Sequence, residues 1–224
     1  MGIDPKHVAG TDDVMNKFSA VLAGLIPDGT VEGGNLYHII TAVGGATLRN
    51  YTTLRNAFVF DDQVMMAWSC RNLLELQLFT VFALSSKENA KTFADDRLVD
   101  GKQIIEKLIK LERYLDPTIT SSPLDNLQNT MTQKAISEGI TRTRFIDTRE
   151  LAGQQGMAEE FDTVNRIASK LVHPTAWSLL TDDIKDQRFP QAGELFYGTG
   201  AKYALTVAVT VQDHVNQFGM RHKP

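Results

Sequence analysis

Three residues near the end of a predicted helix have the types and spacing needed for proton transfer at a phosphate group. Arg166, Ser169 and His173 are separated by three and four positions, so they follow one face of a helix predicted over residues 158–172, with His173 at its end. The helix dipole favours the charged form of a histidine at this position, and an imidazole titrates near neutral pH. Beside the cation of Arg166, His173 can therefore act as a general acid or base on a phosphodiester. The alternative is that His173 only caps its helix and that Arg166 is solvated.

A second candidate pair, Arg71 and Glu75, lies in the middle of the most apolar segment of the chain, residues 63–84. Because the two residues are four positions apart, they share a helix face and can form an ion pair. An isolated charge inside an apolar core costs several kcal/mol, so we expect both side chains to be largely buried and hydrogen-bonded. Two interpretations stay open. The pair either locks helix packing, or it lines a polar pocket in which Glu75 orients Arg71 or an imidazole.

The densest basic stretch contains Arg142, Arg144 and Arg149. Arginines at this spacing can attract the phosphates of a nucleic acid. The alternative is a solvated helix face on which Asp147 and Glu150 pair with these arginines.

Composition excludes several other classes of protein. The chain has 224 residues, a formal net charge of −4 and a single cysteine, Cys70. This excludes an internal disulfide and a zinc site built from several cysteines, and it argues against coating of nucleic acid through bulk charge. The five histidines show no paired metal-ligand spacing, so we expect neither a metal nor another cofactor.

The elements that must position these residues are predicted to be helices. Apolar residues recur with helical period in seven segments, and few segments alternate with period two, so the sequence predicts an all-α bundle of six or seven helices. We expect residues 1–10 to be a flexible leader, residues 11–224 to form one helical domain, and residues 181–198 to make an irregular or hairpin excursion. The helices are predicted over residues 11–26, 35–58, 63–84, 87–114 (with a turn near 95–100), 124–148, 158–172 and 201–218.

No segment is predicted to cross a membrane or to direct export. The first ten residues contain no apolar run, and charged residues interrupt the apolar segment that begins at Val64. Because the chain also has a single thiol, we expect a cytoplasmic protein.

The segment around Arg166 resembles the signature of HEPN-type helical proteins. In that signature an arginine beside a polar residue is followed, after four to six residues, by a histidine. Six residues separate Arg166 from His173, and the polar neighbour in this chain, Asn165, precedes the arginine.

The pattern Arg71-x-x-x-Glu75 followed late in the chain by Ser169-x-x-x-His173 is similar to a bacterial group of helical proteins related to HEPN. The match extends over residues 60–175. The resemblance implies an all-α bundle, frequently dimeric, in which arginine and histidine of two protomers form a metal-independent ribonuclease site. It also implies RNA rather than DNA as the partner, in a toxin or phage-defence setting. The residues implied are His173, Arg166, Arg71 and Glu75 in catalysis, and Asn165, Ser169, Arg142 and Arg144 in substrate binding.

Two hypotheses without catalysis stand beside this one. In the first, the chain is a helical module whose Arg71, Glu75 and His173 cluster is structural or binds a small anionic ligand. In the second, it is a regulatory subunit that binds its partner through an exposed helix.

Overall fold

The computed structural model describes residues 3–27, 31–172 and 190–217. Eight helices contain 85 % of these described residues and no strand occurs among them, which confirms the predicted all-α fold. The helices are α1 (Pro5–Gly24), α2 (Val31–Val59), α3 (Gln63–Ser85), α4 (Lys87–Leu115), α5 (Pro123–Ser137), α6 (Thr148–Gln154), α7 (Ala158–Val172) and α9 (Pro190–Gln217).

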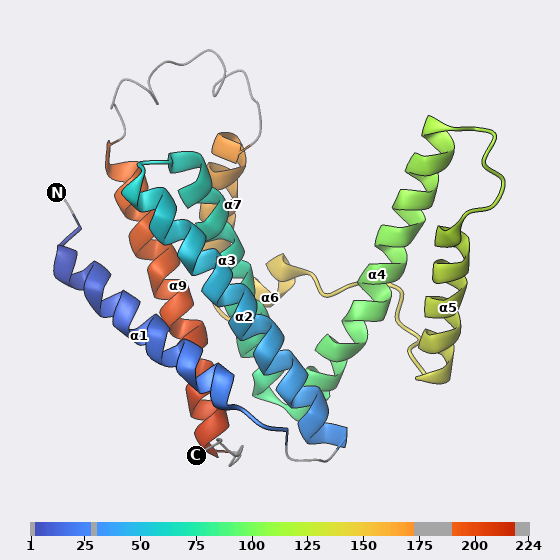
Figure 1. Cartoon of the computed structure of the whole chain (residues 1–224), viewed down its shortest axis with the longest axis horizontal. Helices are drawn as coiled ribbons and strands as arrows, with labels where there is room; N and C mark the ends of the chain where they lie inside the picture. The colour runs from blue at the N-terminus through green and yellow to red at the C-terminus, as the bar shows by residue number, and fades with distance from the viewer. Residues whose placement is uncertain (1–2, 28–30, 173–189, 218–224) are drawn as a thin grey trace.

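Helix α3 is the centre of the bundle (Figure 1). It packs against α2, α7 and α9 and also contacts α4 and α6, while α1 lies against α2 and α9. The side chains that α3 directs into the core are at most 1 % exposed; they include Met66, Cys70, Leu73, Leu74 and Leu78. Burial of apolar area on this scale is the main stabilising contribution to such a bundle.

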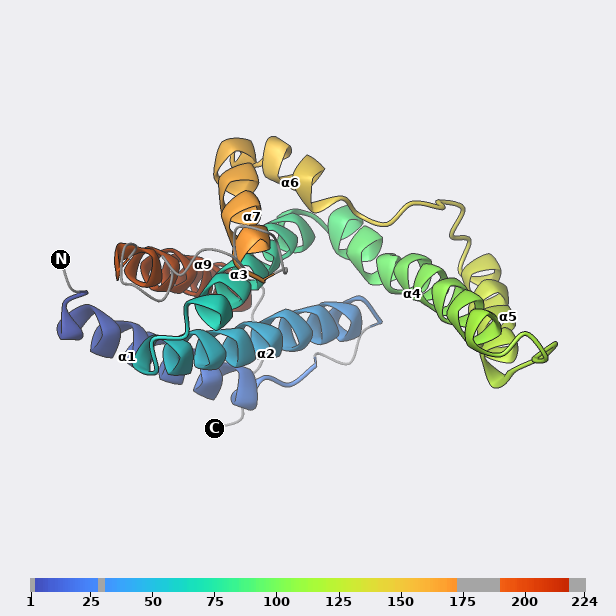
Figure 2. The ribbon, with the colours of Figure 1, turned by 90° about the horizontal axis from the view of Figure 1, so that it is seen from above.

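Helices α4 and α5 form an arm that projects from the bundle (Figures 1 and 2). The first half of α4 is held at the bundle, where the ring of Phe93 lies 5.5 Å from the ring of Phe79 in α3. Helix α5 then folds back along the second half of α4. Ser122 and Asp125 form a capping box at the start of α5, which satisfies backbone donors there.

Several helix ends coincide with the signals that predicted them. The carboxylate of Asp62 accepts a hydrogen bond from the N–H of Met65 (3.0 Å), and the hydroxyl of Ser86 accepts one from Asn89 (3.0 Å). These caps begin α3 and α4 at the predicted residues. The start of α7 at Ala158 also agrees with the prediction.

The structure differs from the leader predicted over residues 1–10, because α1 already begins at Pro5. The Asp4 carboxylate accepts a hydrogen bond from the N–H of Lys6 (2.9 Å), and Val8 is buried in the core. Aspartate followed by proline at the first helical position is a helix start, and this signal precedes the predicted start at residue 11.

The turn predicted near residues 95–100 is absent, and α4 continues through it. Asp95 pairs with Lys91 one turn earlier (2.6 Å), and Asp96 pairs with Arg142 (2.8 Å). Asp95 and Asp96 therefore have their partners while the helix remains unbroken.

The helix predicted over residues 124–148 is two helices, α5 and α6. Helix α5 ends at Ser137, and Gly139 follows with a φ of 68°, a left-handed conformation that glycine adopts readily. Helix α6 begins after Asp147, whose carboxylate accepts from the N–H of Arg149 (2.7 Å).

The irregular or hairpin excursion predicted over residues 181–198 is wrong for its second part, because residues 190–198 belong to α9. Residues 181–189 lie outside the described residues. Glycines make the helical pattern of this segment weak. Gly193, however, lies so close to α3 that a Cβ atom on it would lie 2.8 Å from Cε of Met66. Tertiary packing thus outweighs the low helix propensity of glycine.

Candidate functional site

Arg71 and Glu75 form the predicted ion pair on α3, with Nε of Arg71 3.3 Å from Oε1 of Glu75. The prediction that both are largely buried is wrong, since the side chains are 39 % and 28 % exposed. Helices α2, α7 and α9 cover most of α3 but leave this flank open to solvent. A pair exposed to this degree contributes about 0–1 kcal/mol, so its value to stability is small.

The polar flank continues from α3 onto α2. Nδ2 of Asn72 donates a hydrogen bond to Oδ1 of Asn50 across the two helices (3.2 Å). Trp68, one turn before Asn72, exposes part of its indole on the same side of α3. This flank therefore presents guanidinium, carboxylate and amide groups beside an aromatic ring.

Helix α7 presents an arginine that is not engaged within the described part of the chain. Arg166 is exposed, and no hydrogen bond or ion pair joins it to another described residue. Asp162, one turn earlier, pairs with Arg149 instead (2.9 Å). Arg166 thus keeps its guanidinium available to a ligand. His173 lies outside the described residues, so its geometry relative to Arg166 is not part of this structure.

Asn165 and Ser169 are half-buried on α7. Nδ2 of Asn165 donates to the carbonyl of Phe161 (3.1 Å), while its buried Oδ1 has no hydrogen-bond partner among the described residues. A buried acceptor without a partner is unusual, because it loses its contact with water without compensation.

Helices α3 and α7 are packed side by side and run in opposite directions (Figure 1). Their register is set where Nε2 of Gln77 contacts Sδ of Met157 (3.2 Å). Arg71 lies six residues before Gln77 and Arg166 nine residues after Met157, so at 1.5 Å per residue their heights differ by roughly one turn. Arg166 nevertheless lies on the face of α7 opposite to the buried Phe161, Ala168 and Leu171, so it points away from α3 and the two arginines share a level but not a common face.

Arg142 and Arg144 are placed on a different part of the molecule. Nη2 of Arg142 donates to the carbonyl of Thr92 (2.7 Å) and lies 2.8 Å from the carboxylate of Asp96. Burial raises the pKa of Asp96 above its ordinary value, although Arg142 and the N–H of Ile146 act against this. Arg142 therefore holds the segment that follows α5 against helix α4. Arg144 is exposed.

A polar contact between α7 and α9 has no signal in the sequence. The hydroxyl of Tyr203 donates to Oε1 of Glu160 (2.8 Å), and Nζ of Lys202 lies 3.2 Å from the same oxygen. Burial of the hydroxyl, together with its hydrogen bond to the Glu160 carboxylate, raises the pKa of Tyr203. The partners are 43 residues apart in the chain, so only the fold brings them together.

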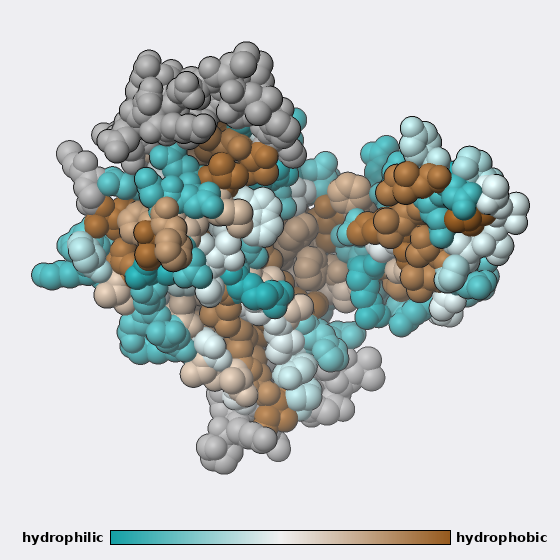
Figure 3. Space-filling view, turned by 45° about the horizontal axis from the view of Figure 1, so that its top comes forward, coloured by the Kyte–Doolittle hydropathy of each residue, from teal (hydrophilic) through white to brown (hydrophobic). Residues whose placement is uncertain are grey.

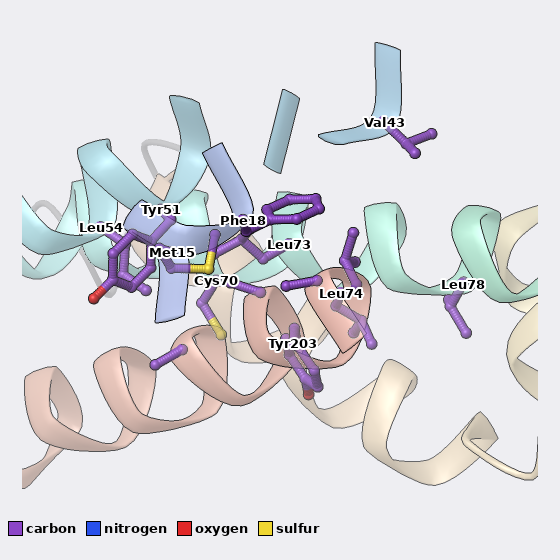
Figure 4. Packing of buried hydrophobic residues seen from close by; sticks show 14 of the residues in the cluster. Met15, Phe18, Val43, Tyr51, Leu54, Cys70, Leu73, Leu74, Leu78 and Tyr203 are labelled. Carbon is purple, nitrogen blue, oxygen red and sulfur yellow. The ribbon is translucent and has the colours of Figure 1, made fainter. Parts of the chain in front are cut away.

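Cys70 is a core residue. Its side chain is fully buried between α3 and α9, near Tyr203 (Figure 4). Burial raises the pKa of the thiol to about 12. A protonated, inaccessible thiol is a poor nucleophile, so Cys70 does not belong to the candidate site.

A second polar cluster joins α1 to α2 and α9. The Asp12 carboxylate accepts from the hydroxyl of Tyr51 (2.6 Å) and from Nε of Arg55 (3.2 Å), and the hydroxyl of Tyr197 lies 3.3 Å from that of Tyr51. A groove of about 370 Å³ runs beside it between α1 and α2, lined in part by Asn16, Asp12 and Arg55. The groove is separate from the residues predicted to be functional.

Comparisons with protein-family models, curated proteins and solved structures found no significant match to this chain. Within residues 3–27, 31–172 and 190–217, no three His, Cys, Asp or Glu side chains come together as metal ligands. No helix in this part of the chain is both long and apolar enough to cross a membrane.

Proposed function

We propose that this protein is a metal-independent ribonuclease whose site lies at the C-terminal half of α7, which leads to His173. The observation that carries the proposal is the exposed guanidinium of Arg166, which is not engaged by a described residue and lies on the helix that leads into His173. A planar guanidinium binds phosphate through two parallel hydrogen bonds.

Arg71 supports the same chemistry. Its hydrogen bond to Glu75 uses Nε, and neither terminal nitrogen donates to a described residue. Glu75 therefore holds the arginine by one edge while the other edge stays available to a phosphate oxygen. A guanidinium held in this way can stabilise the negative charge that develops on a phosphorane.

In the proposed reaction His173 removes the proton from a ribose 2′-hydroxyl. The 2′-oxygen attacks the adjacent phosphorus, the bond from phosphorus to the 5′-oxygen breaks, and that oxygen takes up a proton. The products are a 2′,3′-cyclic phosphate and a 5′-hydroxyl end. An RNA substrate also suits the cytoplasmic location expected from the sequence.

The experiment is cleavage of an end-labelled, mixed-sequence single-stranded RNA in the presence of EDTA. We expect His173→Ala to lower the rate by about 10²–10⁴-fold and Arg166→Lys to lower it as well, because lysine lacks the planar two-pronged contact. Arg97→Ala is the matched control, since Arg97 is an exposed arginine on α4 (64 % exposed). DNA of the same sequence should stay intact. Activity that survives His173→Ala, or that EDTA abolishes, refutes the proposal.

One observation favours a second candidate, a module that binds an anion without cleaving it. Arg71 and Glu75 already neutralise each other at 3.3 Å, which is the arrangement of a positioning pair rather than of a general acid. If RNA binds with an affinity that falls in Arg166→Ala and is never cleaved, the binding module replaces the ribonuclease.

A further inference from the structure

The arm formed by α4 and α5 has an apolar face that its own chain leaves exposed. Its α4 residues follow each other at spacings of four, three and four, which is the heptad spacing of a helix that packs against another helix. The residues are Ile104 (52 % exposed), Leu108 (44 %), Leu111 (52 %) and Leu115 (73 %) of α4, with Leu127 (46 %) of α5. We call this set the arm seam.

The seam is distinct from the contact that joins the two helices of the arm. Ile105 and Ile109 are the α4 residues that are buried at that level, and a Cβ atom on Gly101 would lie 2.5 Å from Cε of Met131 in α5. Helix α4 therefore carries two apolar stripes beyond the bundle. One is covered within the chain, and the other is open to solvent (Figure 3).

Both helices contribute to the same side of the arm. Arg113 of α4 binds Asp125 of α5 through Nη2 (2.9 Å) and marks one side. Leu111 is two residues before Arg113, and Leu127 is two residues after Asp125. Two residues correspond to about 200° around a helix, so both leucines lie on the side of the arm opposite to this ion pair. The seam is thus one continuous surface across α4 and α5.

We infer that the arm seam binds the same seam of a second copy of this chain, so that two arms form an antiparallel four-helix bundle. A twofold axis at the midpoint of the stripe pairs Ile104 with Leu115 and Leu108 with Leu111 of the other copy. The stripe is therefore self-complementary, as a twofold interface requires. Two two-helix arms supply the four helices of such a bundle.

The area of the seam fits a dimer. At about 200 Å² for a fully exposed leucine, the five side chains expose roughly 500 Å² per copy, within the range of the largest functional patches on monomers. Two copies would bury roughly 1,000 Å² from these side chains alone, which reaches the lower bound for a specific interface before the polar rim is counted. This inference does not depend on the proposed ribonuclease.

The test is the mass of the full chain in solution, measured by sedimentation and by light scattering at concentrations up to about 100 µM. We expect a mass twice the 24.9 kDa of one chain. The double variant Leu108→Asp with Leu111→Asp should raise the dimer dissociation constant by about 100-fold or more, because it places charges in the centre of the seam. The control is Ile136→Asp, an exposed residue (66 %) on the face of α5 opposite to Leu127, which should remain dimeric.

Cross-linking tests the seam without relying on a charged variant that folds poorly. The only native thiol, Cys70, is 0 % exposed, so in Leu111→Cys a short bismaleimide should react at position 111 and give a covalent dimer. The same reagent should leave Ile136→Cys monomeric. A monomeric wild-type chain at the highest concentration overturns the inference. So does a dimer whose dissociation constant the double variant leaves unchanged.

Discussion

Two glycines in α9 give opposite predictions for the same substitution. Gly200 is buried against α3, and a Cβ atom on it would lie 2.7 Å from Cδ2 of Leu54 and 3.3 Å from the backbone Cα of Cys70. Gly198, two residues earlier in the same helix, is exposed and has nothing within 4 Å of that position. We therefore expect Gly200→Ala to destabilise the protein and Gly198→Ala to stabilise it.

The magnitudes follow from two opposing effects. Alanine in a helix is favoured over glycine by about 0.5–1 kcal/mol, and this gain applies at both positions. At Gly200 the added methyl lies about 1 Å inside the normal carbon–carbon contact distance. Leu54 of α2 is fully buried and the Cys70 contact is backbone of α3, so the added methyl requires the Leu54 side chain to repack and α3 to shift. Overpacking of this kind costs about 1–3 kcal/mol. The two variants should therefore differ by roughly 1–3 kcal/mol in free energy of unfolding.

The measurement is urea unfolding of both variants and of wild type, followed by circular dichroism. Because the chemical change is identical, its effect on the unfolded chain largely cancels between the variants. For a domain of this size the difference corresponds to a Tm separation of several degrees, at about 2–4 °C per kcal/mol. The reasoning is refuted if Gly200→Ala is as stable as Gly198→Ala.

Three further predictions concern charged and titratable groups. Burial raises the pKa of Cys70 to about 12 from an ordinary value of 9.0, so its contribution to stability is complete below pH 9 and is lost as the pH rises towards 12. The urea midpoint should fall across that range, less steeply in Cys70→Ala, and the native thiol should not react with a maleimide at neutral pH. Glu75→Ala should lower the free energy of unfolding by no more than about 1 kcal/mol, because its pair with Arg71 is partly solvated; a loss of 3 kcal/mol or more would mean that the pair is coupled to the core. Arg142→Ala should cost about 1–3 kcal/mol, since it leaves Asp96, whose side chain is 14 % exposed, without its ion pair; unchanged denaturation and proteolysis would contradict the anchoring role.

Local signals in the sequence were sufficient for most of the helices. The Asp62 and Ser86 caps, and the apolar period of α7, act between residues one turn apart, so neighbouring residues alone contain the information. Where the prediction was wrong, packing outweighed a local preference. Gly193 lowers helix propensity, but it allows α9 to approach Met66 closely, and the helix extends through it.

The sequence by itself determined that the chain is helical, that α3 is its most apolar helix, and that Arg71 and Glu75 share one face. Only the tertiary structure decided how exposed that face is, because exposure depends on which flank of α3 the helices α2, α7 and α9 cover. The same holds for Arg142. The sequence predicted that it contacts phosphate, whereas in the fold it donates a hydrogen bond to Thr92 of α4, which is 50 residues away in the chain. Periodicity reports which residues share a helix face, whereas the partner of that face is chosen by contacts between segments far apart in the chain.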